Sequence, residues 1–152
     1  MIGVVETQFA YTLSDHHAGF RGLMDGAEAF LAAGLVPAKM AAHIMTALDE
    51  IVSNIFHHGA RDGEPLVDVT LWIEADRVSA QIVDDGLAFD PLQSADPDIS
   101  LSSEARPIGG LGIFLVRRMM DDVRYDLDHG KNRLRFYKLF ALEPPDSASS
   151  AH

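Results

Sequence analysis

The chain has 152 residues, 47% of them hydrophobic and 23% charged, and a formal net charge of −11 at pH 7. This length and composition predict a single globular domain over residues 1–141, followed by a tail at residues 142–152 that we expect to be disordered. The acidic charge argues against direct nucleic-acid binding. The chain has no cysteine and no apolar run long enough to span a membrane, so we expect a cytoplasmic protein without disulfides.

The first half of the chain is predicted to contain one strand and two helices. Weak alternation over residues 2–12 predicts an edge strand, and apolar residues at three-to-four spacing predict a helix over 15–33. Pro37 is suited to the first turn of a second helix, which we expect to run to about His58 and to end at Gly59.

The second half is predicted to contain mainly strands. In order, the patterns predict strands at 67–73 and 78–84, a long mobile loop at 91–108, a helix at about 112–120, and a hairpin of strands 123–128 and 133–139 around a turn at 129–132. A loop as long as 91–108 in a compact domain is usually functional or disordered.

The second predicted helix carries two polar side chains that could take part in chemistry. Glu50 and Asn54 lie one turn apart, on a different face from the apolar stripe of that helix. A carboxylate can accept a proton from a hydroxyl group or a water molecule. An amide oxygen is a neutral ligand suited to a magnesium ion that keeps most of its waters. The two side chains could therefore project together into a cleft beside the core, although a solvated helix face explains the pair alone more simply.

Asp84 ends the second predicted strand on the same face as Val78, Ala80 and Ile82. These apolar neighbours indicate that the face meets the core, where a carboxylate is costly unless it accepts hydrogen bonds. The amino group of an adenine base would be a suitable donor, and Gly86 would let a ligand approach the backbone closely. By itself, an Asp before an Asp-Gly turn is more commonly a turn residue.

A cluster of glycines precedes the third predicted helix, at positions 109, 110 and 112. Backbone amides at the start of a helix attract phosphate, and glycines remove the side chains that would block it. The segment does not match a P-loop, because no Gly-Lys-Ser/Thr follows. A flexible hinge explains the glycines alone equally well.

In this order and spacing, the three motifs resemble those of the GHKL superfamily of ATPases and kinases, which has the Bergerat ATP-binding fold. Within it, the sequence looks like the anti-sigma-factor serine kinases of bacteria, the RsbW and SpoIIAB type. The resemblance covers about residues 10–140. The segments that carry it are 50–59 (EIVSNIFHHG), 84–91 (DDGLAFDP), 109–113 (GGLGI) and 130–134 (GKNRL).

The resemblance implies roles for residues on the second helix and the second strand. Glu50 would be the general base, and Asn54 would be the ligand of the magnesium ion (Mg2+). Asp84 would bind the amino group of the adenine, and Gly86 would lie beneath the base.

The resemblance also implies where the phosphates would bind. Gly110, Leu111 and Gly112 would line the triphosphate of ATP, and residues 92–108 would form a lid over it. Arg106 is a candidate for contact with the γ-phosphate, although an exposed loop arginine explains it more simply.

We therefore predict a two-layer α/β (α+β) sandwich, with a mixed, mostly antiparallel sheet and helices on one face. The resemblance implies a serine/threonine protein kinase that uses ATP and magnesium, phosphorylates an anti-anti-sigma (STAS-domain) partner, holds a sigma factor and forms a homodimer. One alternative is an ATP-binding regulatory switch of the same fold without phosphotransfer. Another is an α/β domain whose glycines and aspartate serve only turns.

Overall fold

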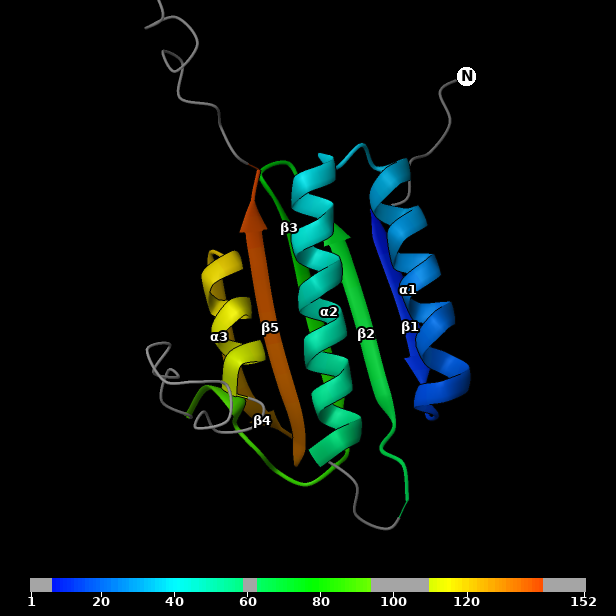
Figure 1. Ribbon diagram of the computed structural model, residues 1–152, viewed down its shortest axis with the longest axis vertical. Helices are drawn as coiled ribbons and strands as arrows, with labels where there is room; N and C mark the ends of the chain where they lie inside the picture. Colours follow the sequence, from blue (N-terminus) through cyan, green and yellow to red (C-terminus); the bar gives the residue numbers. More distant parts are fainter. Residues whose placement is uncertain (1–6, 59–62, 94–109, 141–152) are drawn as a thin grey trace, which may run out of the picture.

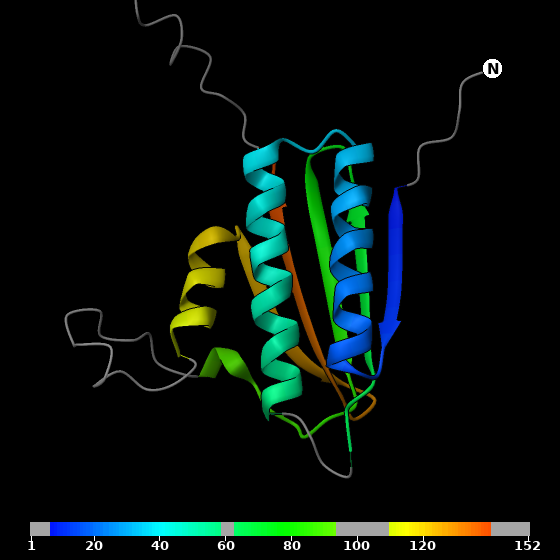
Figure 2. The same ribbon diagram turned by 45° about the vertical axis from the view of Figure 1, so that its right-hand side comes forward.

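The computed structural model describes residues 7–58, 63–93 and 110–140. Its strands are β1 (Gln8–Leu13), β2 (Val67–Ile73), β3 (Arg77–Asp84), β4 (Asp122–Asp128) and β5 (Lys131–Leu139), and its α-helices are α1 (His16–Ala33), α2 (Ala38–His58) and α3 (Gly110–Met119). The strands form one sheet in the order β1-β2-β3-β5-β4. The helices all lie against the same face of this sheet (Figures 1 and 2). Among these residues, no helix is both long and apolar enough to cross a membrane.

The predicted two-layer sandwich with helices on one face is confirmed. The sheet is more regular than expected, because every strand pairing among the described residues is antiparallel. Strands that follow one another in the sequence are neighbours in the sheet, except β3 and β4, between which β5 lies. This arrangement brings the end of β3 beside the start of β5, with Asp84 directly opposite Asn132.

The core lies between the sheet and the helices. Every second residue of β3 is buried, as the period of a strand with one covered face requires. Helix α2 lies over the middle of the sheet (Figure 1), and its stripe of Ile44, Leu48 and Ile51 is buried. The helix therefore presents one side to the core, and its neighbouring side faces the end of β3.

Helix α1 packs closely on the edge strand β1 because position 19 is a glycine. Asp15 caps the helix, and its Oδ1 accepts a hydrogen bond from the His17 amide at 2.8 Å. A Cβ at Gly19 would lie 2.6 Å from the Cβ of Leu13. Since the Leu13 Cβ is fixed to the backbone of β1, a larger residue at position 19 would push the helix away from the strand.

We expect Gly19→Ala to lower the free energy of unfolding by about 1–3 kcal/mol, as overpacking does in other cores. Alanine is the better helix former by about 1 kcal/mol, so propensity alone predicts the opposite sign. Chemical denaturation would measure the difference. Ala29→Gly, at an exposed position of the same helix, is the control for propensity. A Gly19→Ala chain more stable than wild type would contradict the close contact.

The β4–β5 turn differs from the prediction. It consists of His129 and Gly130, with φ angles of 52° and 78°, and two positive φ values are typical of a tight type I′ hairpin. The predicted turn at 129–132 is therefore too long, and Lys131 and Asn132 belong to β5. This correction matters because Asn132 becomes a residue of the sheet.

Other boundaries agree with the predictions to within a few residues. The first three residues of the predicted loop, Pro91–Gln93, form a short 3-10 helix instead. The remainder of that loop, the predicted helix end at Gly59, the chain before Thr7 and the predicted tail lie outside the described residues.

Candidate functional site

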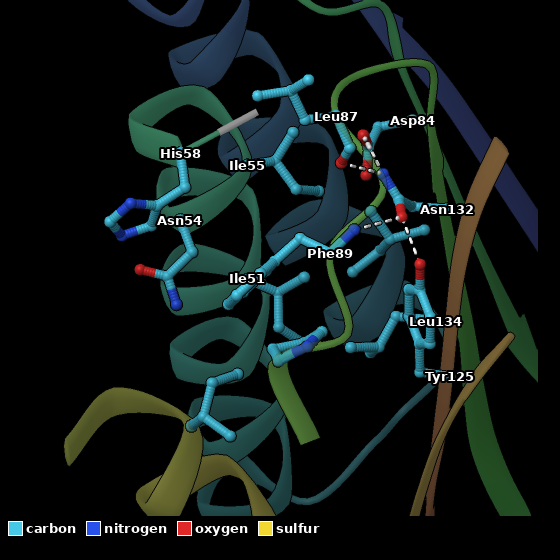
Figure 3. A pocket seen from close by; sticks show the side chains of 13 residues that line it. Ile51, Asn54, Ile55, His58, Asp84, Leu87, Phe89, Tyr125, Asn132 and Leu134 are labelled. Carbon is cyan, nitrogen blue, oxygen red and sulfur yellow. Dashed lines mark hydrogen bonds between the residues drawn. The ribbon is translucent and has the colours of Figure 1, made fainter. Parts of the chain in front are cut away.

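A pocket lies between α2 and the sheet, where β3 ends (Figure 3). It has about 480 Å³ of empty space, part of it open to solvent. Its lining residues are Ile51, Asn54, Ile55 and His58 of α2, and Ile82, Asp84, Leu87, Phe89, Pro91, Ile113, Tyr125, Asn132 and Leu134. Most of these side chains are apolar. The few polar groups therefore determine which ligand orientations the pocket accepts.

Asp84 lies on the buried face of β3, as strand parity predicts, and is only 5% exposed. Its Oδ1 accepts hydrogen bonds from the Gly86 amide at 2.9 Å and from Asn132 Nδ2 at 3.0 Å. Burial raises the pKa of Asp84 above its ordinary value, and these two hydrogen bonds act in the opposite direction. No described residue donates to Oδ2, which makes this oxygen an acceptor available to a ligand.

Asn132 connects Asp84 to the loop after β3 and to β4. Its Nδ2 also donates to the Leu87 carbonyl oxygen at 2.8 Å, and its Oδ1 accepts from the Phe89 amide at 3.1 Å. The Tyr125 hydroxyl donates to the same Oδ1. Figure 3 shows these contacts on the wall opposite α2. The amide thus uses both of its donors and both of its acceptor positions.

Glu50 lies one turn before Asn54 on α2, and its carboxylate faces α3. A Cβ at Gly112 would lie 2.1 Å from Glu50 Oε2, so a larger residue at position 112 would have to displace the carboxylate. Gly112 is in the first turn of α3, which begins at Gly110. The first turn of a helix favours negative charge. The glycine predicted to make room for phosphate therefore also makes room for the proposed base.

The structure brings several of the predicted site residues together. Asn54 and Asp84 line the same pocket from opposite walls, and Gly86 is buried two residues after Asp84. Glu50 does not line the pocket but lies against the start of α3. The side chain of Leu111 and the whole of Arg106 lie outside the description, so their predicted roles remain predictions.

The sequence motifs assign no role to Asn132 or Tyr125. Asn132 is the other buried polar side chain of the described residues besides Asp84, with 7% exposure. A signal was present in the sequence, since Asn132 shares the parity of Leu134 and Phe136, which both face the core. The predicted turn at 129–132 includes Asn132, so strand parity is not applied to it there.

The residues present fit a magnesium ion only if it enters together with a phosphorylated ligand. Asn54 is one of the residues that line the pocket, and magnesium commonly binds one or two protein oxygens plus phosphates and waters. The described residues contain no group of three or more His, Cys, Asp and Glu side chains that would hold a metal alone. The donor set therefore suits a magnesium–nucleotide complex.

A model of the histidine kinase-like ATPase domain family matches residues 13–138. The chain belongs to this family. The match covers every residue that lines the pocket, so the pocket lies within the ATPase domain.

Curated relatives of this ATPase domain are serine kinases by name. The chain is 34% identical over 87 residues to the serine/threonine-protein kinase BtrW of Bordetella bronchiseptica, covering 57% of this chain and 61% of the relative. It is 34% identical over 91 residues to the serine-protein kinase RsbW of Listeria monocytogenes, covering 55% and 57%. The aligned segment thus spans little more than half the length of these relatives.

A solved structure supports the fold independently. The nucleotide-free catalytic domain of the histidine kinase ThkA superposes with a TM-score of 0.50 at 12% identity, covering 89% of this chain and 99% of that domain. At this identity the likeness concerns the fold of the ATPase domain alone.

The buried carboxylate of Asp84 is expected to make stability depend on pH. Its folded-state pKa is raised above the roughly 3.9 of an unfolded chain. The folded state therefore binds the proton more tightly, and this contribution to stability is lost as the pH rises through the folded pKa. Asp84→Asn cannot ionise and keeps an oxygen for Gly86 and Asn132. We therefore expect the difference between the melting temperatures of the variant and the wild type to change with pH. This difference, in favour of the variant, should grow from about pH 4 through the folded pKa of Asp84 and then level off.

Asp85→Asn is the matched control for Asp84→Asn, because it removes the same charge from an exposed neighbour. It also keeps an oxygen for the Leu66 amide, which donates to Asp85 Oδ1 at 2.7 Å. A stability difference between Asp84→Asn and wild type that is constant with pH would contradict a buried ionisable carboxylate at position 84.

Proposed function

We propose that the chain is a protein serine/threonine kinase that binds ATP with magnesium in the pocket between α2 and the sheet. The observation that carries the proposal is the Oδ2 of the buried Asp84, to which no described residue donates, in a pocket that Asn54 lines from the opposite wall. Family membership over residues 13–138 and the names of the relatives support it. The proposed kinase unit is the predicted domain of residues 1–141.

The adenine base would enter between the apolar residues of α2 and those of the strands. Its amino group would donate to Asp84 Oδ2, because Oδ1 already accepts two hydrogen bonds. Gly86 would allow the base to approach the backbone. The triphosphate would extend toward the start of α3, where Gly110, Leu111 and Gly112 would supply backbone amides.

Phosphotransfer would use Glu50 as the base. Its carboxylate would take the proton of a partner serine hydroxyl, while the serine oxygen bonds to the γ-phosphorus and the bond from that phosphorus to ADP breaks. Asn54 would hold magnesium, which supplies positive charge to the phosphates when it is bound. Glu50 is suited to this role because it lies against the first turn of α3, at the proposed phosphate site.

The proposed protein partners follow from the resemblance to anti-sigma-factor kinases. The substrate would be an anti-anti-sigma protein with a STAS domain, and an alternative complex would hold a sigma factor and so regulate transcription. We further propose a homodimer that acts in the cytoplasm. Phosphate transfer from labelled ATP to a candidate STAS protein, but not to its serine-to-alanine variant, tests the substrate class.

The second candidate function is an ATP-binding switch of the same fold that transfers no phosphate. The observation in its favour is that Glu50 does not line the pocket itself. Its position against Gly112 favours the kinase, because a protein that only binds ATP does not need a carboxylate there. Binding of ATP without any labelled product would support the switch.

We expect Glu50→Gln to lower the rate of phosphotransfer by about 10²–10⁴-fold, the usual contribution of a general base. The amide has the same shape but cannot take the proton. Nucleotide affinity should stay within a few-fold of wild type, since Glu50 is not part of the adenine pocket. Single-turnover transfer of labelled phosphate and calorimetry with ADP would measure the two quantities.

Asp49→Asn is the control for Glu50→Gln. Asp49 precedes Glu50 on α2 and is exposed, and its side chain accepts a hydrogen bond from the Ser53 hydroxyl of the same helix. The Asp49→Asn variant removes one negative charge from the same helix and leaves the Glu50 side chain unchanged. A Glu50→Gln chain that transfers phosphate at the wild-type rate would rule out Glu50 as the base.

A further inference from the structure

Asn132 makes more polar contacts than packing in the sheet requires. It faces Asp84 across the β3–β5 pairing, and these two are the buried polar side chains of the described part of the chain. Its side-chain amide, on β5, makes four hydrogen bonds: one with the end of β3, one with β4 and two with the loop after β3. A buried side chain with every donor and acceptor satisfied is held in one orientation.

The surroundings of Asn132 determine which end of its amide faces Asp84. Nδ2 lies 2.8 Å from the Leu87 carbonyl oxygen, which can only accept. Oδ1 lies 3.1 Å from the Phe89 amide nitrogen, which can only donate. Reversing the amide would therefore place oxygen against oxygen and donor against donor. The donor end must face Asp84, where it meets Oδ1 at 3.0 Å.

These contacts leave the two oxygens of Asp84 in different states. Oδ1 accepts from Asn132 and from the Gly86 amide, whereas Oδ2 receives no hydrogen bond from a described residue. The two oxygens of a carboxylate are equivalent, so the Asn132 contact acts on the plane of the group: two donors on one oxygen fix that plane, and a single donor would leave it free to turn. The Asn132 contact thus fixes the direction in which the other oxygen of Asp84, a residue that lines the pocket, can accept a hydrogen bond.

We propose that Asn132 is a positioning residue for base recognition: it orients Asp84 so that Oδ2 selects a purine that carries an exocyclic amino group. Asn132 acts by holding Asp84 and the loop after β3 in place. The group that accepts the hydrogen bond from the purine amino group is Asp84, not Asn132. The proposal rests on the proposed function, because it assumes that adenine binds against Asp84.

The test compares two nucleotides that differ only in the amino group, ADP and purine riboside 5′-diphosphate. The measured quantity is the ratio of their affinities. A general loss of stability would weaken both nucleotides together and leave the ratio unchanged. The ratio therefore reports on the orientation of Asp84 and not on folding.

The informative variants are Asn132→Val and Asn132→Thr. Both side chains have nearly the same shape and are favoured in strands, but only threonine offers a hydroxyl donor opposite Asp84. We expect Asn132→Val to reduce the ratio by about tenfold or more, since a hydrogen bond to a charged group is worth at least that factor. Asn132→Thr should keep the ratio within about threefold of wild type, because it retains a donor.

Val69→Ala is the stability control. Val69 is buried in β2 and does not line the pocket, so this variant should weaken the fold and keep the wild-type ratio. An Asn132→Val chain that keeps the wild-type ratio would overturn the role of Asn132. An equal loss in the valine and threonine variants would overturn hydrogen-bond donation as its cause.

The wild-type chain separates this proposal from the function on which it rests. A wild-type chain that binds ADP but not the purine analogue, together with an unaffected Asn132→Val ratio, contradicts the role of Asn132 alone. A wild-type chain that binds both nucleotides equally, or neither, contradicts the adenine site itself and the positioning role with it.

Discussion

The organisation of the site depends on one buried polar pair, Asp84 and Asn132. Each would be costly in the core alone, since an unpaired carboxylate and an unpaired amide both lose their hydration. Their hydrogen bond between β3 and β5 gives each of the two buried groups one of the partners that it needs. The carboxylate is still penalised by burial, and its pKa is raised. Such a group is rarely retained for stability alone. Asp84 lines a pocket and its Oδ2 accepts no hydrogen bond from a described residue, which fits the proposed recognition of a ligand.

The order of the strands puts this pair where helices can complete a site. Because β5 lies between β3 and β4, the end of β3 meets the hairpin turn, and Tyr125 reaches Asn132 from the far side. Helix α2 supplies the opposite wall of the pocket, and its polar side continues to Glu50 at the start of α3. The proposed base-recognition group, Asp84, thus lies on one wall of the pocket, and the proposed proton acceptor, Glu50, lies on the helix that forms the opposite wall.

Much of this arrangement could be predicted from local patterns. Strand parity correctly placed Asp84 on the buried face, and helical periodicity correctly separated Asn54 from the core stripe. Asn132 could not be placed in the same way, because His129 takes a left-handed conformation and shortens the turn to two residues. A histidine gives only a weak signal for such a conformation. The closeness of Glu50 to Gly112 depends on the packing of two helices, which no local pattern encodes.

The central claim is that Asp84 recognises the base of a nucleotide in the pocket between α2 and the sheet. A crystal structure of the chain with ADP and magnesium tests it most directly. The account predicts the amino group of the adenine within about 2.7–3.2 Å of Asp84 Oδ2, with Asn132 still bonded to Oδ1. An adenine bound elsewhere, or one whose amino group points away from Asp84, would contradict it.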